Sequence, residues 1–480
     1  MNEYQLYING RYEPANSGKV VESMNPATGV AFAKVHQANQ SDAARTLEVS
    51  WEAFLAWKKV RPCEREAVFI KAAELFAQRK DELVDVLVDE AGSTLIKANT
   101  EVGHTIQHTL SMAGECRRVS GETYWSDLPG VQSYCIRRPI GLVHAISPFN
   151  FPLLLSNKKI GWALAAGNAV ILKPSEVTPV VGLKLAEIYS EAGLPDGVLN
   201  VLPGTGEDLG DSIISDPRVK KVVFTGSSKV GKQIGITCAQ HRTAFSLELG
   251  GKNPLIVLAD ADLDYAVNTA AFSNFMHQGQ VCMSGSRVIV EDPIYDEFIE
   301  RFTAKVSTIK AGNPREPGVI IGPLIREEQP ALIQSCVDAA VDQGARLMTG
   351  GTSSGSIYQP TVVADVTQDM DLFRTECFGP VASVIKASDY QHAIELANDT
   401  NYGLSAAVIT NDLQKSISMI DELEAGMVHV NGPTIRDEPG IPFGGVNDSG
   451  QGREGGKFSM DDFTELKWVT IQRGQQQFPF

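Results

Sequence analysis

A cysteine stands among small and flexible residues in the segment GQVCMSGSR, residues 279–287. The thiol of Cys282 is either a nucleophile or a small side chain without chemistry. A nucleophilic thiol reacts as the thiolate, so the first interpretation requires a depressed pKa or a nearby base. The other six of the seven cysteines have no comparable setting, and we expect them to be structural.

Two polar residues elsewhere could complete such chemistry. Asn150 follows the strand-like run GLVHAIS in SPFNFP, and a buried amide there could donate to a developing oxyanion. An asparagine at this point could equally serve a turn. Glu248 ends a second strand-like run in FSLELGGKNP. Its carboxylate could be a general base, or it could be a salt-bridged or helix-capping glutamate.

Three further segments could bind a nucleotide. In KVVFTGSSKVGKQI, Gly226 and Ser227 lie where a strand meets a helix, a place that suits a phosphate, although Gly226 and Gly231 do not fit the G-x-G-x-x-G spacing. In ILKPSEVTP, Glu176 follows a strand. Its carboxylate could bind ribose hydroxyls and repel a 2′-phosphate, which favours NAD over NADP; otherwise Glu176 caps the following helix. In RTECFGP a glutamate could hold a ribose and a phenylalanine could pack on a flat ring, or both could be ordinary loop residues.

Alternating secondary structure must position these residues. LYINGRY predicts a hairpin that turns at Asn9-Gly10, and residues 41–116 have a helical pattern with Ser41 and Asp42 as N-cap candidates and Gly92 as a stop. Four β-branched runs, GLVHAIS, NAVILKP, LNVLPG and KKVVFTG, then alternate with helical segments. A second alternation after residue 250 contains NPLIVLA, DLDYAVNTAAFSNFM and SRVIVED. This pattern predicts an α/β protein with a doubly wound parallel sheet and a cleft between two units. The segments SDLPGVQSYCIRRP and WVTIQRGQQQ are typical of strands outside this alternation, and since lone strands usually pair with another strand, a partner subunit is one candidate for that pairing.

Composition excludes several classes of function. The 480 residues carry a formal net charge of −16, and no Lys/Arg cluster forms the basic face of a nucleic-acid binder. The start of the chain does not resemble a secretory signal, and no apolar run is long enough to span a bilayer. The odd cysteine count and the missing signal predict a cytoplasmic protein. His104 and His108 are one helical turn apart but lack a third ligand, so we expect no metal.

Seven motifs in order resemble the aldehyde dehydrogenase superfamily: SPFNFP, LKPSE, VFTGS, LELGGKNP, GQVC, ECFGP and PFGGVNDSGQGREGG. The interval from Glu248 to Cys282 is 34 residues (282 − 248), the spacing usual in that family. The resemblance implies a Rossmann-type NAD-binding domain (1–118 and 139–249), an α/β catalytic domain (250–447), and a small β oligomerisation arm with the C-terminal segment (119–138 and 448–480).

The resemblance also implies a role for each matching residue. Cys282 is the nucleophile, Glu248 the base for the hydrolytic water, and Asn150 the oxyanion donor beside the backbone N–H of the nucleophile. The residues implied to bind NAD, or alternatively NADP, are Lys173, Ser175, Glu176, Gly206, Gly226, Ser227, Gly231, Glu376 and Phe378. The implied reaction passes through a thiohemiacetal and a thioester to the carboxylic acid, in a homo-oligomer that is a dimer or a tetramer.

The stretch HVNGPTIRDEPGIPFGGV resembles the benzaldehyde, vanillin and salicylaldehyde dehydrogenase branch, which implies an aromatic aldehyde. Arg436, Asn157 and Lys158 depart from that branch and could line the substrate pocket; Arg436 could pair with a carboxylate or phenolate there. Four alternatives stay open: an enzyme for aliphatic or carboxylate-bearing semialdehydes, a relative that passes the acyl group to coenzyme A, a catalytically silent binding protein, and a cysteine hydrolase. The last would need a histidine partner such as His277 for its thiol.

Overall fold

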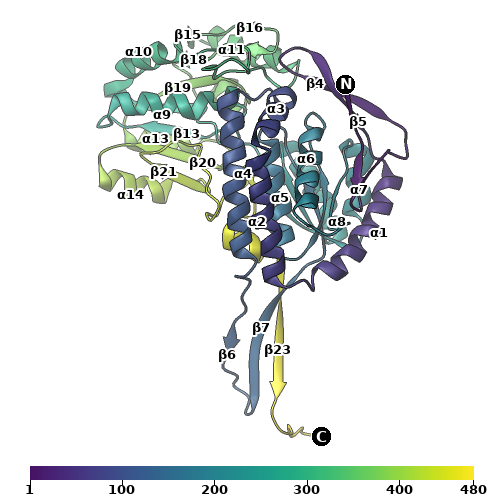
Figure 1. Cartoon of the computed structure of the whole chain (residues 1–480). Coiled ribbons are helices and arrows are strands. Elements are labelled where there is room, and N and C mark those ends of the chain that lie inside the picture. Colours follow the sequence, from purple (N-terminus) through teal and green to yellow (C-terminus); the bar gives the residue numbers. More distant parts are fainter.

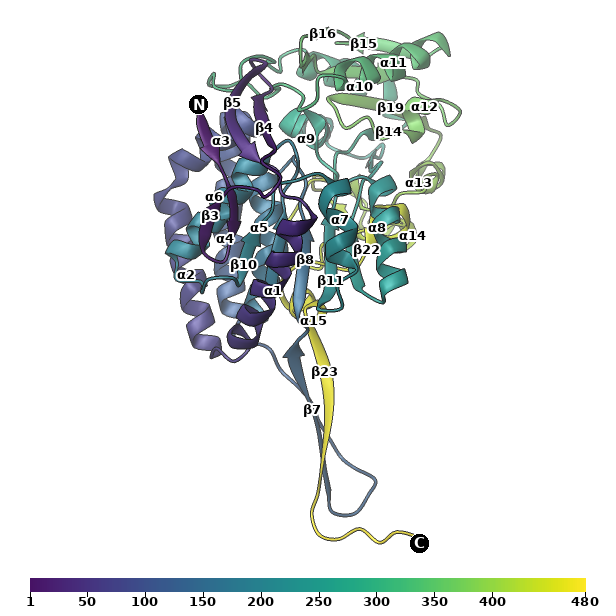
Figure 2. The ribbon, with the colours of Figure 1, turned by 90° about the vertical axis from the view of Figure 1, so that its right-hand side faces the viewer.

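The largest sheet has eight strands, seven from residues 6–248 and one from residues 450–451 (Figures 1 and 2). The computed structural model describes residues 1–480, with the surroundings of Gly210 left out. In spatial order the strands are β22 (Gly450–Gln451), β12 (Ala244–Glu248), β11 (Val219–Thr225), β8 (Leu142–Ile146), β9 (Ala169–Lys173), β10 (Leu199–Val201), β2 (Leu6–Ile8) and β3 (Arg11–Glu13). The five strands from β12 to β10 are parallel, and β22, β2 and β3 add antiparallel edges.

Helices connect the parallel strands in the doubly wound manner. The connecting helices are α5 (Pro152–Ala165), α6 (Pro179–Glu191), α7 (Gly206–Ile214) and α8 (Ser228–His241). From β8 the chain adds β9 and β10 on one side, and then returns to add β11 and β12 on the other. The order therefore reverses between β8 and β11, which is where such sheets bind ligands, at the carboxyl ends of the strands. All four strand-like runs of this region are strands, as predicted.

The N-terminal elements also follow the sequence pattern, with one difference at a helix cap. Asn9 and Gly10 have positive φ values of 52° and 75° in the turn between β2 and β3, as the predicted hairpin requires. The helices of this region are α1 (Gln40–Trp57), α2 (Pro62–Gln78), α3 (Lys80–Ala91) and α4 (Leu95–Glu115). The N-cap of α1 is Asn39 and not Ser41 or Asp42, because the Asn39 side chain accepts from both of their amides while Asp42 accepts from the Asn39 amide. A small sheet of β1 (Asn2–Tyr4), β5 (Val30–His36) and β4 (Val20–Asn25) flanks these helices.

A second α/β layer system follows residue 250. Its strands are, in spatial order, β15 (Arg346–Thr349), β18 (Thr361–Ala364), β19 (Val381–Ala387), β14 (Arg287–Glu291), β13 (Pro254–Val257), β20 (Ser405–Ile409) and β21 (Met427–Val430). Its helices are α9 (Leu263–Phe275), α10 (Tyr295–Val306), α11 (Gln329–Asp342), α12 (Asp371–Arg374), α13 (Tyr390–Asn398) and α14 (Leu413–Glu422). Separate clusters of buried aliphatic and aromatic side chains pack on the two faces of this sheet, which explains its near-continuous apolar strands.

A three-stranded arm projects away from both sheets (Figures 1 and 2). It consists of β6 (Thr123–Tyr124), β7 (Val131–Pro139) and β23 (Thr464–Gln472), with α15 (Gly456–Asp462) leading into it. The two segments that the sequence placed outside the main alternation therefore pair with each other within one chain. The pairing is antiparallel and extends along the whole of β7 and β23. Within the described part of the chain, no helix has the length and hydropathy needed to cross a membrane.

Candidate active site

Two cavities meet at Cys282. One, of about 670 Å³, lies at the carboxyl ends of β8, β9 and β11, and we call it the strand-end cavity. The other, of about 660 Å³, lies among α4, α5, α9 and residues 435–443, and we call it the apolar cavity. Asn150 and Cys282 line both. A reactant in one cavity can therefore reach the same thiol as a reactant in the other.

Cys282 lies in the loop between α9 and β14, and the loop is fixed by a buried amide. Asn253 donates from Nδ2 to the carbonyls of Cys282 (2.8 Å) and Ser284 (2.9 Å). Gly251 packs so closely on this loop that an added Cβ would lie 2.6 Å from the Cys282 carbonyl oxygen. These contacts hold the thiol in place while its sulfur faces the two cavities.

The pKa of Cys282 is raised to about 12, the opposite of the depressed value that a free thiolate would need. Burial is the main cause, and the negative charges of Glu376 and Glu248 add to it. A nucleophilic Cys282 therefore requires a nearby base that removes the thiol proton, which is the second of the two conditions set out in the sequence analysis. Of these two carboxylates, Glu376 already accepts from the Gly251 amide, whereas Glu248 Oε2 has no hydrogen-bond partner among the described residues, so Glu248 is the candidate to accept the thiol proton.

The turn before Cys282 is strained and held by hydrogen bonds. His277 and Gln278 have left-handed φ values of 49° and 56°, and strain of this kind persists only where the surroundings enforce it. The Gln278 amide donates to the carbonyls of Pro323 (2.9 Å) and Gly92 (3.3 Å). Neither ring nitrogen of His277 has a partner among the described residues, so there is no Cys–His pair of the kind a cysteine hydrolase needs.

Asn150 lies in the loop after β8 and is 3% exposed. Its Nδ2 donates to the Gln280 carbonyl (2.9 Å), which uses one of the two N–H bonds of the amide. The second N–H remains for a group bound beside Cys282. A buried amide fixed in this way is a preorganised donor for negative charge on an oxygen.

Glu248 is the last residue of β12, and its side chain is buried. One carboxylate oxygen lies against Gly444, where an added Cβ would come within 3.0 Å, and Oε2 has no hydrogen-bond partner among the described side chains. Burial and the charge of Glu454 raise the pKa of Glu248 well above its ordinary value, while Lys159 and Lys158 oppose the shift. A carboxylate with a raised pKa is a stronger base at neutral pH.

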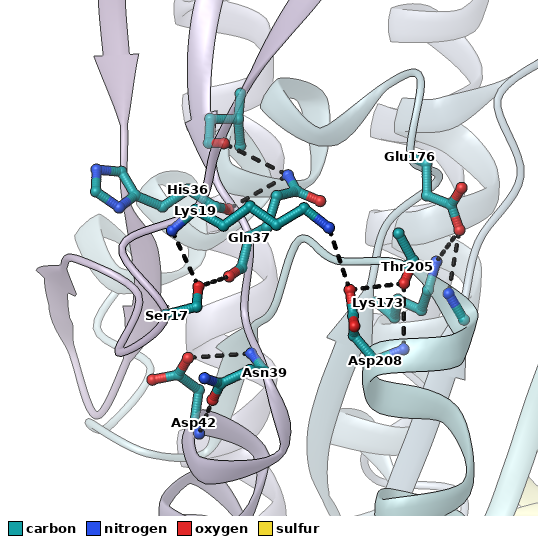
Figure 3. Close-up of polar contacts among 12 residues, drawn as sticks. Ser17, Lys19, His36, Gln37, Asn39, Asp42, Lys173, Glu176, Thr205 and Asp208 are labelled. Carbon is teal, nitrogen blue, oxygen red and sulfur yellow. Dashed lines mark hydrogen bonds and ion pairs between the residues drawn. The ribbon is translucent and has the colours of Figure 1, made fainter.

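A lysine and a glutamate line the strand-end cavity, and Figure 3 shows the contact between them. Lys173 ends β9, and its Nζ is 3.5 Å from Glu176 Oε1. The same carboxylate oxygen accepts from the backbone N–H of Gly206 (3.2 Å), at the start of α7. Glu176 therefore does not cap α6, the helix that follows it, and its half-exposed carboxylate is available to ribose hydroxyls. Ser175 lines the cavity between them.

The N-terminus of α8 also lines this cavity. Gly226 and Ser227 line it, and the Ser227 side chain caps the helix by accepting from the Val230 amide. Free amides at a helix N-terminus attract phosphate groups. Gly231 is placed differently: it lies buried in α8 against Leu249, where an added Cβ would come within 2.4 Å of a side-chain carbon. Its structural role is close packing of helix on strand rather than contact with a ligand.

Glu376 and Phe378 lie at the end of the strand-end cavity that is next to Cys282. Glu376 accepts from the Gly251 amide (3.1 Å), and burial raises the pKa of its carboxyl to about 7. Phe378 packs edge-on against Phe149, with ring centroids 5.8 Å apart. Together the cavity offers a phosphate site flanked by two carboxylates, a set of donors and acceptors that fits a nicotinamide dinucleotide with one ribose at each end.

Aromatic and aliphatic side chains that the sequence reasoning did not single out form most of the apolar cavity, among them Phe151, Leu154, Phe272, Phe275, Met283 and Phe443. Phe151 directly follows Asn150, and this position next to a candidate oxyanion donor is the sequence feature that could have identified it as a cavity residue. The helix α9 supplies others, and because its apolar residues are not confined to one side, its pattern does not separate cavity residues from core residues.

The three residues that depart from the aromatic branch have different positions. Arg436 lines the apolar cavity, but it is more than half exposed and pairs with Glu438 (3.1 Å). Asn157 is buried and forms hydrogen bonds with Thr109 and Tyr189, away from the cavity lining.

Lys158 is also buried, and its Nζ lies 2.9 Å from Asp437 Oδ2 and 3.3 Å from Glu454. His108, one of the two histidines considered above, lies 3.6 Å from the same Asp437 oxygen. In the described part of the chain, no cluster of three or more His, Cys, Asp or Glu side chains is arranged to hold a metal ion.

The model of the aldehyde dehydrogenase family matches residues 12–469. A vanillin dehydrogenase of Pseudomonas fluorescens is 40% identical, with each chain covered over 100% of its length. A benzaldehyde dehydrogenase [NAD(+)] of Pseudomonas putida is 39% identical over 96% of this chain and 95% of that one. The solved structure of a salicylaldehyde dehydrogenase from Pseudomonas putida G7, complexed with salicylaldehyde, superposes with a TM-score of 0.98 at 34% identity, and each chain is covered over 100%.

Proposed function

The chain belongs to the aldehyde dehydrogenase family, and from that premise we propose that it oxidises aromatic aldehydes to carboxylic acids with NAD. The observation that carries the aromatic assignment is the apolar cavity, which places phenylalanine rings from three separate segments next to Cys282. A benzaldehyde ring gains both burial and edge-to-face contacts in such surroundings. The relatives named for vanillin, benzaldehyde and salicylaldehyde support the same assignment.

The first chemical step is attack of the Cys282 sulfur on the aldehyde carbon. Because the thiol pKa is high, the proton must leave as the bond forms, and the Glu248 carboxylate accepts it. The free N–H of Asn150 then donates to the oxygen of the thiohemiacetal, whose negative charge it stabilises. NAD bound in the strand-end cavity supplies the hydride acceptor. Glu248 then releases the thiol proton to solvent and takes a proton from water as the hydroxide attacks the thioester carbon. The C–S bond breaks, the carboxylic acid is released, and the Cys282 thiolate takes back a proton from Glu248.

The preference for NAD over NADP follows from Glu176. Its carboxylate stands beside the Gly206 amide at the ribose end of the cavity, where it can accept from two ribose hydroxyls. A 2′-phosphate placed there would meet like charge. Lys173 lessens this repulsion but also pairs with Glu176, so we expect NADP to be used less efficiently rather than rejected.

The structure favours neutral aromatic substrates over carboxylate-bearing ones. Arg436, which the sequence offered as the partner of a substrate carboxylate, is already paired with Glu438, and Asp437 and Glu438 add negative charge to the same cavity wall. The retained Glu248 supports hydrolysis of the thioester over transfer to coenzyme A.

A homo-oligomer is part of the proposal. The outer edge of β23 carries no further strand within the described chain, and the arm exposes Trp468 (72%) and Leu466 (58%). Exposed apolar groups on an unpaired strand edge are features of an interface. We also propose a reducing compartment such as the cytoplasm, because none of the seven cysteines is paired in the structure, which describes all of them.

The test of the function is NAD(P)H formation by the purified protein over a panel of aldehydes. The panel contains benzaldehyde, hydroxybenzaldehydes, short aliphatic aldehydes and semialdehydes, each with NAD and with NADP. We expect the highest kcat/KM for aromatic aldehydes with NAD. Highest efficiency with an aliphatic or carboxylate-bearing aldehyde would overturn the aromatic assignment and leave the chemistry at Cys282 standing.

A further inference from the structure

A buried histidine in the apolar cavity has no hydrogen-bond partner. His277 is 1% exposed and lines the cavity together with Cys282 and Asn150. Among the described residues neither Nδ1 nor Nε2 forms a hydrogen bond. Buried polar side chains are nearly always bonded, so an imidazole with two free nitrogens at a cavity wall indicates a group that arrives from the cavity.

The backbone holds this ring where it is. The left-handed turn of His277 and Gln278 is secured by the two bonds of the Gln278 amide described above, and the Phe151 ring packs edge-on against the imidazole with centroids 5.5 Å apart. The backbone of this turn is therefore fixed, and rotation of the imidazole would give up its packing against Phe151.

The imidazole is neutral at ordinary pH. Burial lowers the pKa of His277 well below its usual value, and the nearby charge of Lys97 lowers it further. The Asn150 carbonyl opposes this shift but does not meet hydrogen-bond geometry with the ring. A neutral imidazole has one nitrogen that donates and one that accepts, which is the pair of functions complementary to a hydroxyl group.

Two charged groups of the cavity, Lys97 and Asp437, are already engaged. The Lys97 ammonium bonds Ser93 (3.0 Å) and pairs with Glu101, and it lies over the Phe151 ring. Asp437 keeps one free oxygen, but its carboxylate is part of the ion pair with Lys158. Among the residues that line the cavity, His277 is the uncharged donor and acceptor that stands closest in sequence to the thiol.

We infer that His277 is a specificity-determining residue that binds the ring hydroxyl of a hydroxybenzaldehyde. This inference rests on the proposed function, since it needs an aromatic aldehyde in the apolar cavity. With the aldehyde carbon at Cys282 and the ring against Phe151, the phenol O–H donates to the imidazole nitrogen that lacks a proton. An unsubstituted benzaldehyde fills the same space but leaves this nitrogen unsatisfied.

The test compares substrates that differ only in the ring hydroxyl. For 2-, 3- and 4-hydroxybenzaldehyde and for benzaldehyde, kcat/KM is measured with the wild type, His277→Gly and His277→Asn. Glycine and asparagine both accept a left-handed φ, so neither change strains the turn. His104→Asn is the matched control, because His104 is the other imidazole that lines the cavity.

We expect the ratio of kcat/KM for the best hydroxybenzaldehyde to that for benzaldehyde to fall about three- to tenfold in both His277 variants, the value of one hydrogen bond. Added imidazole should restore the ratio in His277→Gly, and His104→Asn should keep the wild-type ratio. An unchanged ratio in both His277 variants, or a ratio that falls equally in His104→Asn, would overturn the inference while the aromatic function stands. A wild type that oxidises no aromatic aldehyde would overturn both.

Discussion

Replacement of Asn150 by alanine tests the geometry of the candidate site most directly. The side chain has two N–H bonds; one is on the Gln280 carbonyl at 2.9 Å, and the other is free beside Cys282. Loss of one fixed donor to a developing oxyanion slows catalysis by about 10²–10³, which corresponds to about 2.7–4 kcal/mol. We therefore expect the rate of hydride transfer in Asn150→Ala to fall by that factor, with NAD affinity unchanged.

The same substitution also removes a structural bond, and the two effects must be separated. Gln280 is 1% exposed, so its carbonyl would lose its donor inside the protein at a cost of about 1–3 kcal/mol in the free energy of unfolding. Asn157→Ala is the matched control. Asn157 is equally buried, donates to Thr109 (3.0 Å), accepts from Tyr189 (2.8 Å) and does not line either cavity described above.

The assay is the pre-steady-state formation of NADH at saturating NAD, run well below the melting temperature of each variant. Thermal unfolding should show a comparable loss of stability for both alanine variants, whereas only Asn150→Ala should lose the fast phase. A hydride-transfer rate within threefold of wild type in Asn150→Ala would refute the oxyanion assignment. An equal rate loss in Asn157→Ala would refute it as well, since the cause would then be general loosening of α5.

Four further outcomes are expected. Cys282→Ala should abolish turnover without weakening NAD binding in a fluorescence titration, and residual dehydrogenase activity would remove it as the nucleophile. Glu248 accepts protons only above its raised pKa, so the steady-state rate should increase with pH through that range. Glu248→Gln should lose this pH dependence and show one burst of NADH followed by slow release of the acid. An unaltered steady-state rate in this variant would exclude Glu248 as the base. Glu376 becomes a carboxylate as pH rises through about 7, so KM for NAD should fall between pH 6 and 8 in the wild type but stay flat in Glu376→Gln. Gly231→Val forces a methyl group toward Leu249, which should cost about 1–3 kcal/mol of stability and raise KM for NAD more than KM for the aldehyde; equal effects on both would contradict a local displacement of α8.

Local patterns were sufficient for most of the fold. The β-branched runs that became β8, β9, β10 and β11 alternate with helices, and this alternation alone indicated a doubly wound sheet. The motif order led to the family, which the comparisons confirm. The cap of α1 was wrong because Asn39, Ser41 and Asp42 are all good cap residues, and only the reciprocal bonds distinguish them.

Features that depend on distant segments could not be predicted. The pairing of β7 with β23 joins residues more than 300 positions apart, so each strand alone suggested an external partner. The raised pKa of Cys282 results from burial and from two carboxylates, Glu376 and Glu248, which lie in segments distant from it in the sequence. His277 was considered only as a partner for the thiol, because its free nitrogens and its place in the cavity wall are visible only in space.

The separation of the two cavities has a consequence for how such an enzyme can diverge. Only Asn150 and Cys282 are common to both linings, and the remaining walls come from different elements. Substitutions in α9 or in residues 435–438 can therefore change which aldehyde is accepted without altering the cofactor contacts, and substitutions around Glu176 can do the reverse. Selection on substrate range and selection on cofactor use can act on separate sets of residues, so an experimental search for new substrates can leave residues 173–176 and 226–231 untouched.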